Sequence, residues 1–179
     1  ISIMDSVNNH DDSVFYIEKH IADDVRAAGR AAVKSFGVKS RFVHFEFFRL
    51  TEDHDYLGKK GKIIGLEVNY RPSGGFTPDM INYACSTDVY KDWADMVAFD
   101  RLTKEEYPDK YYCVSAGCRK EKHYLHSYEE VMAAYKDDIM MTTELPEVLA
   151  SAMGDRLYLA RFAEKEDMDA FISYVFATA

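Results

Sequence analysis

The chain has 179 residues, a formal net charge of −9 and 47% hydrophobic residues, a composition typical of folded rather than disordered proteins. This length fits one domain, or one domain with a small appendage. The excess of acidic residues argues against a nucleic-acid partner, although it leaves room for a local basic patch. No apolar run approaches the roughly 20 residues that span a membrane.

The N-terminal part of the sequence is predicted to be mostly helical. Ile1–Met4 fits a short strand, and Asn8–Asp12 is a polar turn. We expect a helix over Phe15–Phe36, because apolar side chains recur there three and four residues apart. Gly37 is typical of the residue that ends such a helix.

Two strands follow. Arg41–Leu50 alternates and is rich in aromatic residues, and Lys62–Tyr70 fits a second strand. The polar loop Thr51–Gly61 joins them, so we expect an antiparallel pair. Helices over Pro78–Ala84 and Asp88–Ala98 come next.

Beyond a boundary near residues 107–110, the pattern predicts a small α+β tail with the character of a split βαβ unit. We expect a hairpin of Tyr111–Val114 and His123–His126, followed by a helix that opens with the capping box of Ser127 and Glu130. The remaining predicted elements are a strand over Ile139–Thr143, a short helix from Pro146, a strand over Arg156–Phe162, and a last helix with Met168, Phe171, Ile172, Val175 and Phe176 on one stripe.

These elements predict an α+β fold, with an antiparallel sheet and flanking helices followed by the small α+β tail. We expect residues 1–106 to carry the functional site and residues 107–179 to form a separate subdomain. The three cysteines include no CxxC pair, which favours reduced thiols and a cytoplasmic location.

Acidic and amide side chains gather on one face of the predicted strand pair. Because alternate residues share a face, Glu67, Asn69 and Arg71 should point the same way. His44 and Glu46 share a face of the first strand. Placing Glu46 beside Glu67 is unfavourable unless a cation binds between them. Carboxylate and amide oxygens suit Mg²⁺ or Mn²⁺ better than Zn²⁺.

Two anion-binding features follow this face in the sequence. The guanidinium of Arg71 suits a phosphate or a carboxylate. The Gly74–Gly75 loop and the helix start at Thr77–Pro78 offer free backbone N–H groups. A cation, an arginine and a helix start together predict a place for phosphoryl transfer.

A simpler interpretation leaves the same residues on a solvated sheet face. Glu67 and Asn69 are ordinary on such a face, and His44 fits a packed or hydrogen-bonded histidine better than a metal ligand. Glu46 is harder to explain, because an isolated carboxylate in so aromatic a segment is costly. The other face of the second strand, with Leu66, is predicted to pack into the core.

The succession HFEFFRL, GLEVNYRPSGG and FTPDMINYA resembles the C-terminal part of an ATP-grasp domain, in the branch similar to biotin carboxylase and carboxylate–amine ligases. The resemblance covers Ile3–Ala98 and makes residues 1–106 the C-terminal lobe of that domain. It implies Glu46, Glu67 and Asn69 as ligands of the Mg²⁺ (or Mn²⁺) ions that bridge the phosphates of ATP. It also implies Arg71 as the catalytic, anion-binding arginine.

The activity implied by this resemblance is that of an ATP-dependent ligase. A small carboxylate would react with ATP to give an acyl phosphate, which an amine or another nucleophilic acceptor would attack. The lid lysines and adenine-binding segment of such enzymes precede the metal strands, so we expect a C-terminal portion that is inactive alone. Two alternatives stay open: a degenerate ATP-grasp scaffold, and an unrelated α+β binding module without catalysis.

Overall fold

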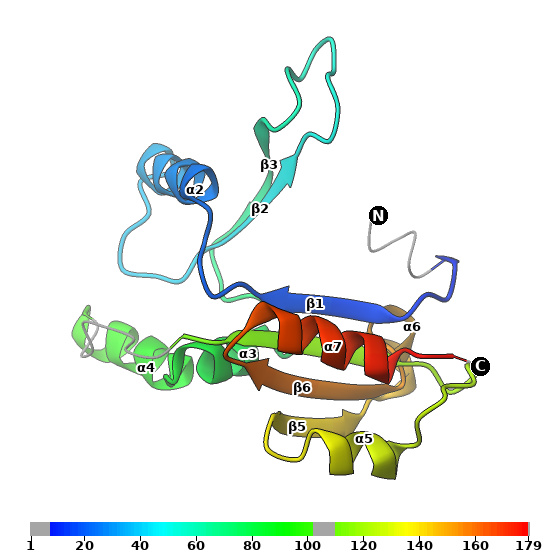
Figure 1. Cartoon of the computed structure of the whole chain (residues 1–179). Coiled ribbons are helices and arrows are strands. Elements are labelled where there is room, and N and C mark those ends of the chain that lie inside the picture. The colour runs from blue at the N-terminus through cyan, green and yellow to red at the C-terminus, as the bar shows by residue number, and fades with distance from the viewer. Residues whose placement is uncertain (1–7, 102–109, 179) are drawn as a thin grey trace. The chain divides into compact units, whose positions relative to one another are not determined.

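The computed structural model describes residues 8–101 and 110–178. These residues form two compact units, each with its own sheet (Figure 1). The described residues of the first unit are 8–19, 79–87 and 110–178, and those of the second are 20–78 and 88–101. The predicted division into residues 1–106 and 107–179 stays a prediction.

A four-stranded antiparallel sheet forms the centre of the first unit. Its strands, in spatial order, are β1 (Ser13–Ile17), β4 (Tyr112–Cys118), β6 (Arg156–Phe162) and β5 (Ile139–Glu144). Both β4 and β5 pair antiparallel with β6, so they run parallel to each other with β6 between them. The helix α5 (Tyr128–Ala134) lies between β4 and β5 in the chain. This arrangement is the split βαβ unit that the sequence predicts.

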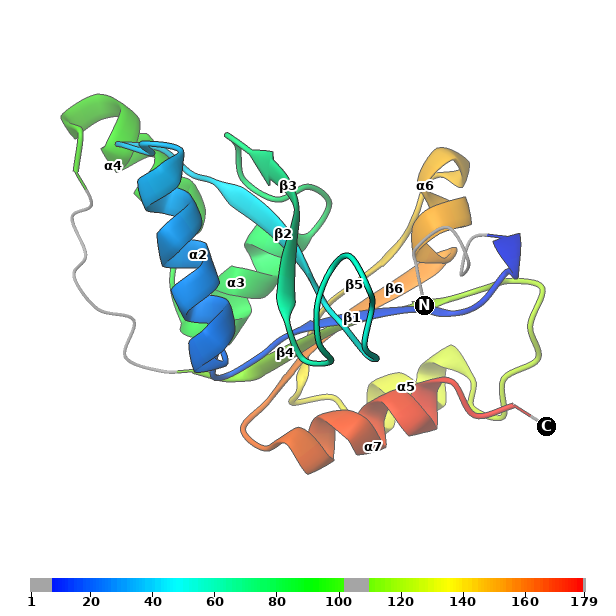
Figure 2. The same cartoon turned by 90° about the horizontal axis from the view of Figure 1, so that it is seen from above.

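Helices cover both faces of this sheet. In Figure 2, α5 and α7 (Lys165–Val175) lie on one side and α6 (Glu147–Met153) lies on the other. The core between the sheet and the helices α5 and α7 consists of Val114, Ala116, Val131, Tyr158, Ala160, Phe162, Met168, Phe171 and Val175. The α7 stripe predicted from the sequence is confirmed, because three of its members are fully buried.

Close packing on the opposite face explains a glycine in β4. A Cβ atom added to Gly117 would lie 1.8 Å from the carbonyl oxygen of Met153, at the end of α6. Only a residue without a side chain allows the strand to approach the helix this closely.

The second unit contains the two-stranded antiparallel sheet of β2 (His44–Arg49) and β3 (Ile63–Asn69), with α2 (Asp23–Ser35) and α4 (Val89–Phe99). The helix α3 (Thr77–Cys85) begins in this unit and continues into the first. Gly37, with φ of +59°, follows the end of α2 as predicted, and its N–H donates a hydrogen bond to the carbonyl oxygen of Lys34.

The predicted helix over Phe15–Phe36 is wrong at its N-terminal end. The helix begins at Asp23, and Ser13–Ile17 instead forms β1, which pairs antiparallel with β4. Valine, phenylalanine, tyrosine and isoleucine are all strong strand formers, so a partner strand outweighs the helical spacing.

The predicted hairpin of Tyr111–Val114 with His123–His126 is also wrong. The partners of β4 are β1 and β6, and Tyr124 instead forms an isolated bridge with Thr178. The other predicted strands and helices are confirmed within a few residues, including the capping box at Ser127. The predicted Ile1–Met4 strand lies outside the described residues, as does most of the boundary near 107–110.

No helix in the described ranges is long and apolar enough to cross a membrane. The three cysteines are free thiols, as predicted, and Cys113 is fully buried.

Candidate functional site

The β2–β3 hairpin places two carboxylates face to face. Glu46 pairs directly with Glu67, and the neighbouring pair is His44 with Asn69. Directly opposed residues on antiparallel strands share one face of the sheet. One donor atom from each of His44, Glu46 and Glu67 lies within 4.8 Å of the others. The hairpin therefore brings three potential metal ligands into one cluster.

Asn69 joins this cluster through a hydrogen bond. Its amide nitrogen donates to Oε1 of Glu67 at 2.5 Å, along the same face of β3. The amide oxygen, which is the atom that would bind a cation, accepts no hydrogen bond from the described residues. The amide nitrogen thus compensates part of the Glu67 charge and leaves the oxygen available.

His44 lies beside Glu46 in this cluster, where the sequence favours a packed or hydrogen-bonded histidine over a metal ligand. Its Nε2 lies 3.7 Å from Oε1 of Glu46, and its buried Nδ1 has no hydrogen-bond partner among the described residues. A buried polar atom without a partner is costly, and a neutral imidazole nitrogen is a common metal ligand. The sequence already places it two residues before Glu46, on the same face of the strand.

The cluster lies at an accessible part of the hairpin. The side chain of Glu46 is 42% exposed and that of His44 is 27% exposed. Glu67 is exposed as well. Neither carboxylate forms an ion pair with a lysine or an arginine in the described part of the chain. The site is therefore accessible to solvent, and the imidazole of His44 is the basic group that the structure places beside a carboxylate there.

Arg71 is not brought into this cluster. The strand β3 ends at Asn69, so the alternation that predicts a shared face stops before Arg71. Its guanidinium Nη1 donates to the carbonyl of Pro72 at 2.9 Å. No ion pair joins it to Glu46 or Glu67 in the described part of the chain, so its role stays a prediction.

The prediction that Leu66 packs into a core is wrong. Leu66 is 54% exposed and Tyr70 is 46% exposed. A two-stranded sheet buries little by itself, and α2 in the same unit has no fully buried residue. Local aromatic contacts replace a core here, such as the stacking of Phe42 on Trp93 with ring centroids 5.6 Å apart.

No model of a known protein family matches this sequence, and no curated protein matches it. Among solved structures, the chain is similar to phosphoribosylglycinamide synthetase from Anaerococcus prevotii, with a TM-score of 0.55 and 14% sequence identity. The match covers 90% of this chain but only 44% of that one, so this chain spans less than half of the matched structure. Identity at this level bears on the fold alone. The likeness supports the predicted α+β fold.

Proposed function

We propose that the face of the hairpin formed by His44, Glu46, Glu67 and Asn69 binds a divalent cation, Mg²⁺ or Mn²⁺, in an ATP-grasp ligase of which this chain is the C-terminal portion. The observation that carries the proposal is the direct opposition of Glu46 and Glu67 without a lysine or arginine partner in the described residues.

The donor set fits such a cation. Two carboxylates and an amide oxygen are hard ligands, which suit Mg²⁺ and Mn²⁺. The imidazole of His44 lies at the edge of the set and is better suited to Mn²⁺ than to Mg²⁺. Two like charges at close range repel, and a cation between them would turn this repulsion into attraction.

In the proposed site, Glu46 and Glu67 hold the cation and Asn69 offers its amide oxygen. When bound, the cation would neutralise part of the charge on the phosphates of ATP. Arg71 would leave the carbonyl of Pro72 and bind the phosphate or the acyl phosphate, because a planar guanidinium matches these groups.

The reaction would proceed in two steps. A substrate carboxylate attacks the γ-phosphate of ATP, which releases ADP and forms an acyl phosphate. An amine or another nucleophile then attacks the acyl carbon, and phosphate leaves as the amide or related bond forms. The matched structure is named a synthetase, which favours a ligase over an unrelated α+β binding module.

Cation binding is tested with this chain alone by titration with Mn²⁺, followed through the loss of the free Mn²⁺ signal in electron paramagnetic resonance. We expect Glu67→Gln and Glu46→Gln each to weaken binding at least tenfold. Glu52→Gln, in the exposed loop between β2 and β3, should bind as the unchanged chain does. Equal binding by all variants would overturn the cation site.

Catalysis is tested in the protein made from the complete reading frame. We expect phosphate release from ATP to depend on an added carboxylate, and Glu67→Gln to lower the turnover by orders of magnitude. ATP hydrolysis that is indifferent to any carboxylate or acceptor would favour the scaffold alternative. Near-normal turnover by Glu67→Gln would refute its assignment.

A further inference from the structure

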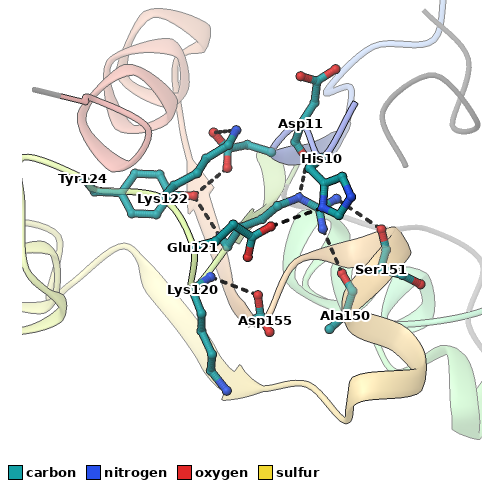
Figure 3. A network of polar contacts seen from close by, with 11 residues as sticks. His10, Asp11, Lys120, Glu121, Lys122, Tyr124, Ala150, Ser151 and Asp155 are labelled. Atoms are coloured by element: carbon teal, nitrogen blue, oxygen red, sulfur yellow. Dashed lines mark hydrogen bonds and ion pairs between the residues drawn. The ribbon is translucent and has the colours of Figure 1, made fainter. Parts of the chain in front are cut away.

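The first unit contains a pocket, lined by charged and aromatic residues, that the hairpin site does not use. Its volume is about 230 Å³, slightly below the usual range for small-molecule pockets. The lining comes from the segment that follows β4 and from α5, β5, β6 and α7. Figure 3 shows part of this region from close by.

The charge of this pocket is opposite to that of the chain. Four basic side chains line it, namely Arg119, Lys120, Lys122 and Arg156, against two acidic ones, Glu144 and Asp155. Four minus two leaves two positive charges on the lining side chains, and Asp12, which pairs with Lys122, reduces this excess to one, in a chain whose formal net charge is −9. A concentration of positive charge in a concave site attracts anions and repels cations.

Two of the basic groups are already paired. The guanidinium of Arg156 lies 2.8 Å from Oε1 of Glu144 and also lies over the Tyr128 ring, 4.5 Å from its centroid. The ammonium of Lys122 lies 3.0 Å from Oδ2 of Asp12. These pairs hold the two side chains in place but do not account for the remaining positive charge.

Lys120 is the basic group left without a carboxylate partner at ion-pair distance in the described part of the chain. Its backbone N–H donates to Oδ2 of Asp155 at 2.9 Å, which fixes the main chain and leaves the ammonium free (Figure 3). Arg156 and then Lys120 hold the pKa of Glu144 below its usual value, so the Lys120 charge acts on the pocket.

Arg119 has a structural explanation that needs no ligand. It is only 5% exposed and donates to the carbonyl oxygens of Asp11, Ala150 and Ser151 (Figure 3). Ala150 and Ser151 lie towards the C-terminal end of α6, where a cation is favoured by the helix dipole. The argument for a ligand therefore depends on Lys120 and Arg156 rather than on Arg119.

Stacked aromatic rings form part of the wall of the pocket. Tyr128 and Tyr158 stack with their ring centroids 6.2 Å apart. His126 stacks on Tyr174, with 3.6 Å between their ring centroids. Tyr158 is 3% exposed, and burial raises its pKa to about 12, so its hydroxyl stays neutral at ordinary pH. Rings held this way order the wall before any ligand arrives, which lowers the entropic cost of binding.

We propose that this pocket binds a small anionic molecule through a phosphate or carboxylate group, with Lys120 and Arg156 as its cationic partners. Arg156 can share its planar guanidinium between Glu144 and a bound oxyanion, since it carries five N–H donors. The pocket belongs to the first unit and the hairpin to the second, so this proposal is independent of the proposed cation site.

The test is a titration of the chain with inorganic phosphate and, separately, with malonate, followed by the amide signals of residues 118–128 in NMR spectra. Ionic strength is held constant with sodium chloride, and no divalent cation is present. We expect saturable shifts with at least one of the two anions. Phosphate alone or malonate alone would identify the group that the pocket prefers.

The decisive variant is Lys120→Glu, which should weaken anion binding at least tenfold. Lys120 is exposed, so this change leaves the fold intact. The matched control is Lys136→Glu, an equal change of charge at an exposed residue that follows α5 and does not line the pocket. No saturable shift with either anion would overturn the proposal. Equal weakening by both variants would do the same, because it would show only a general effect of net charge.

Discussion

Glu46 and Glu67 oppose each other directly across the β2–β3 hairpin, and neither has a lysine or arginine partner in the described residues. Like charges directly opposite on antiparallel strands are destabilising. The adjacent pair of His44 and Asn69 adds two further donors on the same face. The hairpin therefore carries a local instability that a cation would remove.

The first prediction separates repulsion from ligation at this pair. Without metal, Glu67→Gln should unfold at the same urea concentration as the unchanged chain or a slightly higher one, because a repulsive contact is gone. With Mn²⁺ at a hundred times its dissociation constant, the unchanged chain should gain about 2.7 kcal/mol of unfolding free energy. The variant should gain far less. Urea unfolding with and without Mn²⁺ measures both effects.

Glu52→Gln is the control for this experiment, since it removes one carboxylate from the exposed loop that joins the same two strands. It should keep the full gain from Mn²⁺. A Glu67→Gln variant that is stabilised as much as the control would show that Mn²⁺ binds elsewhere.

Local patterning was sufficient to predict the hairpin. Alternation predicts which side chains share a face within each strand, whereas the register that places Glu46 opposite Glu67, next to an irregularity between Glu46 and Phe47, is seen only in the structure. The rule does not extend to Arg71, because the strand ends at Asn69, so the place of Arg71 on this face stays a prediction. The buried Nδ1 of His44, which has no hydrogen-bond partner among the described residues, is visible only in the structure, so local patterning could not supply this argument for a ligand.

Pairing between distant segments was beyond local patterning. Phe15–Ile17 has both helical spacing and strand-forming residues, and its partner β4 lies far along the chain. The predicted partner of β4 was the nearest extended segment, whereas its two partners in the structure, β1 and β6, both lie far from it in the chain. The pocket around Lys120 depends on the ends of the same strands, so the sequence could indicate only room for a basic patch.

The second prediction is that two glycine-to-alanine changes have opposite signs. Gly29 lies inside α2, and a Cβ atom there meets no atom within 4 Å. Gly29→Ala should stabilise the second unit by about 0.5–1 kcal/mol, because alanine loses less backbone entropy in a helix. Gly117→Ala should destabilise the first unit by about 1–3 kcal/mol or more, since the Cβ atom of the new alanine would overlap the carbonyl oxygen of Met153.

Urea unfolding followed by a signal from each unit measures these two changes. Equal tolerance of both would show that β4 and α6 do not approach as closely as the structure has them.

The third prediction concerns the largest side chain of the core. Phe171 is fully buried, and its ring contacts Tyr135 and Phe162 at centroid distances of 4.9 and 5.4 Å. Phe171→Ala should cost about 3–5 kcal/mol of unfolding free energy, because it removes both buried area and ring contacts. Leu149→Ala, at a residue that is 43% exposed, should cost far less. The urea midpoints of the two variants give the comparison, and similar losses would contradict the assigned core.

The last prediction follows from the buried thiol of Cys113. Burial raises its pKa to about 12 from an ordinary value of 9.0, so the native state holds the proton more tightly than the unfolded state does. Between these two values the unfolded chain loses protons that the native chain keeps, and stability must fall as the pH rises above about 9. At pH 10 this single thiol should cost about 1.4 kcal/mol relative to pH 8. Tyrosines titrate in the same range, so the informative quantity is the difference between the unchanged chain and Cys113→Ala at each pH. That difference should shift by this amount in favour of Cys113→Ala between pH 8 and pH 10, and a constant difference would show that Cys113 is not buried in the native state.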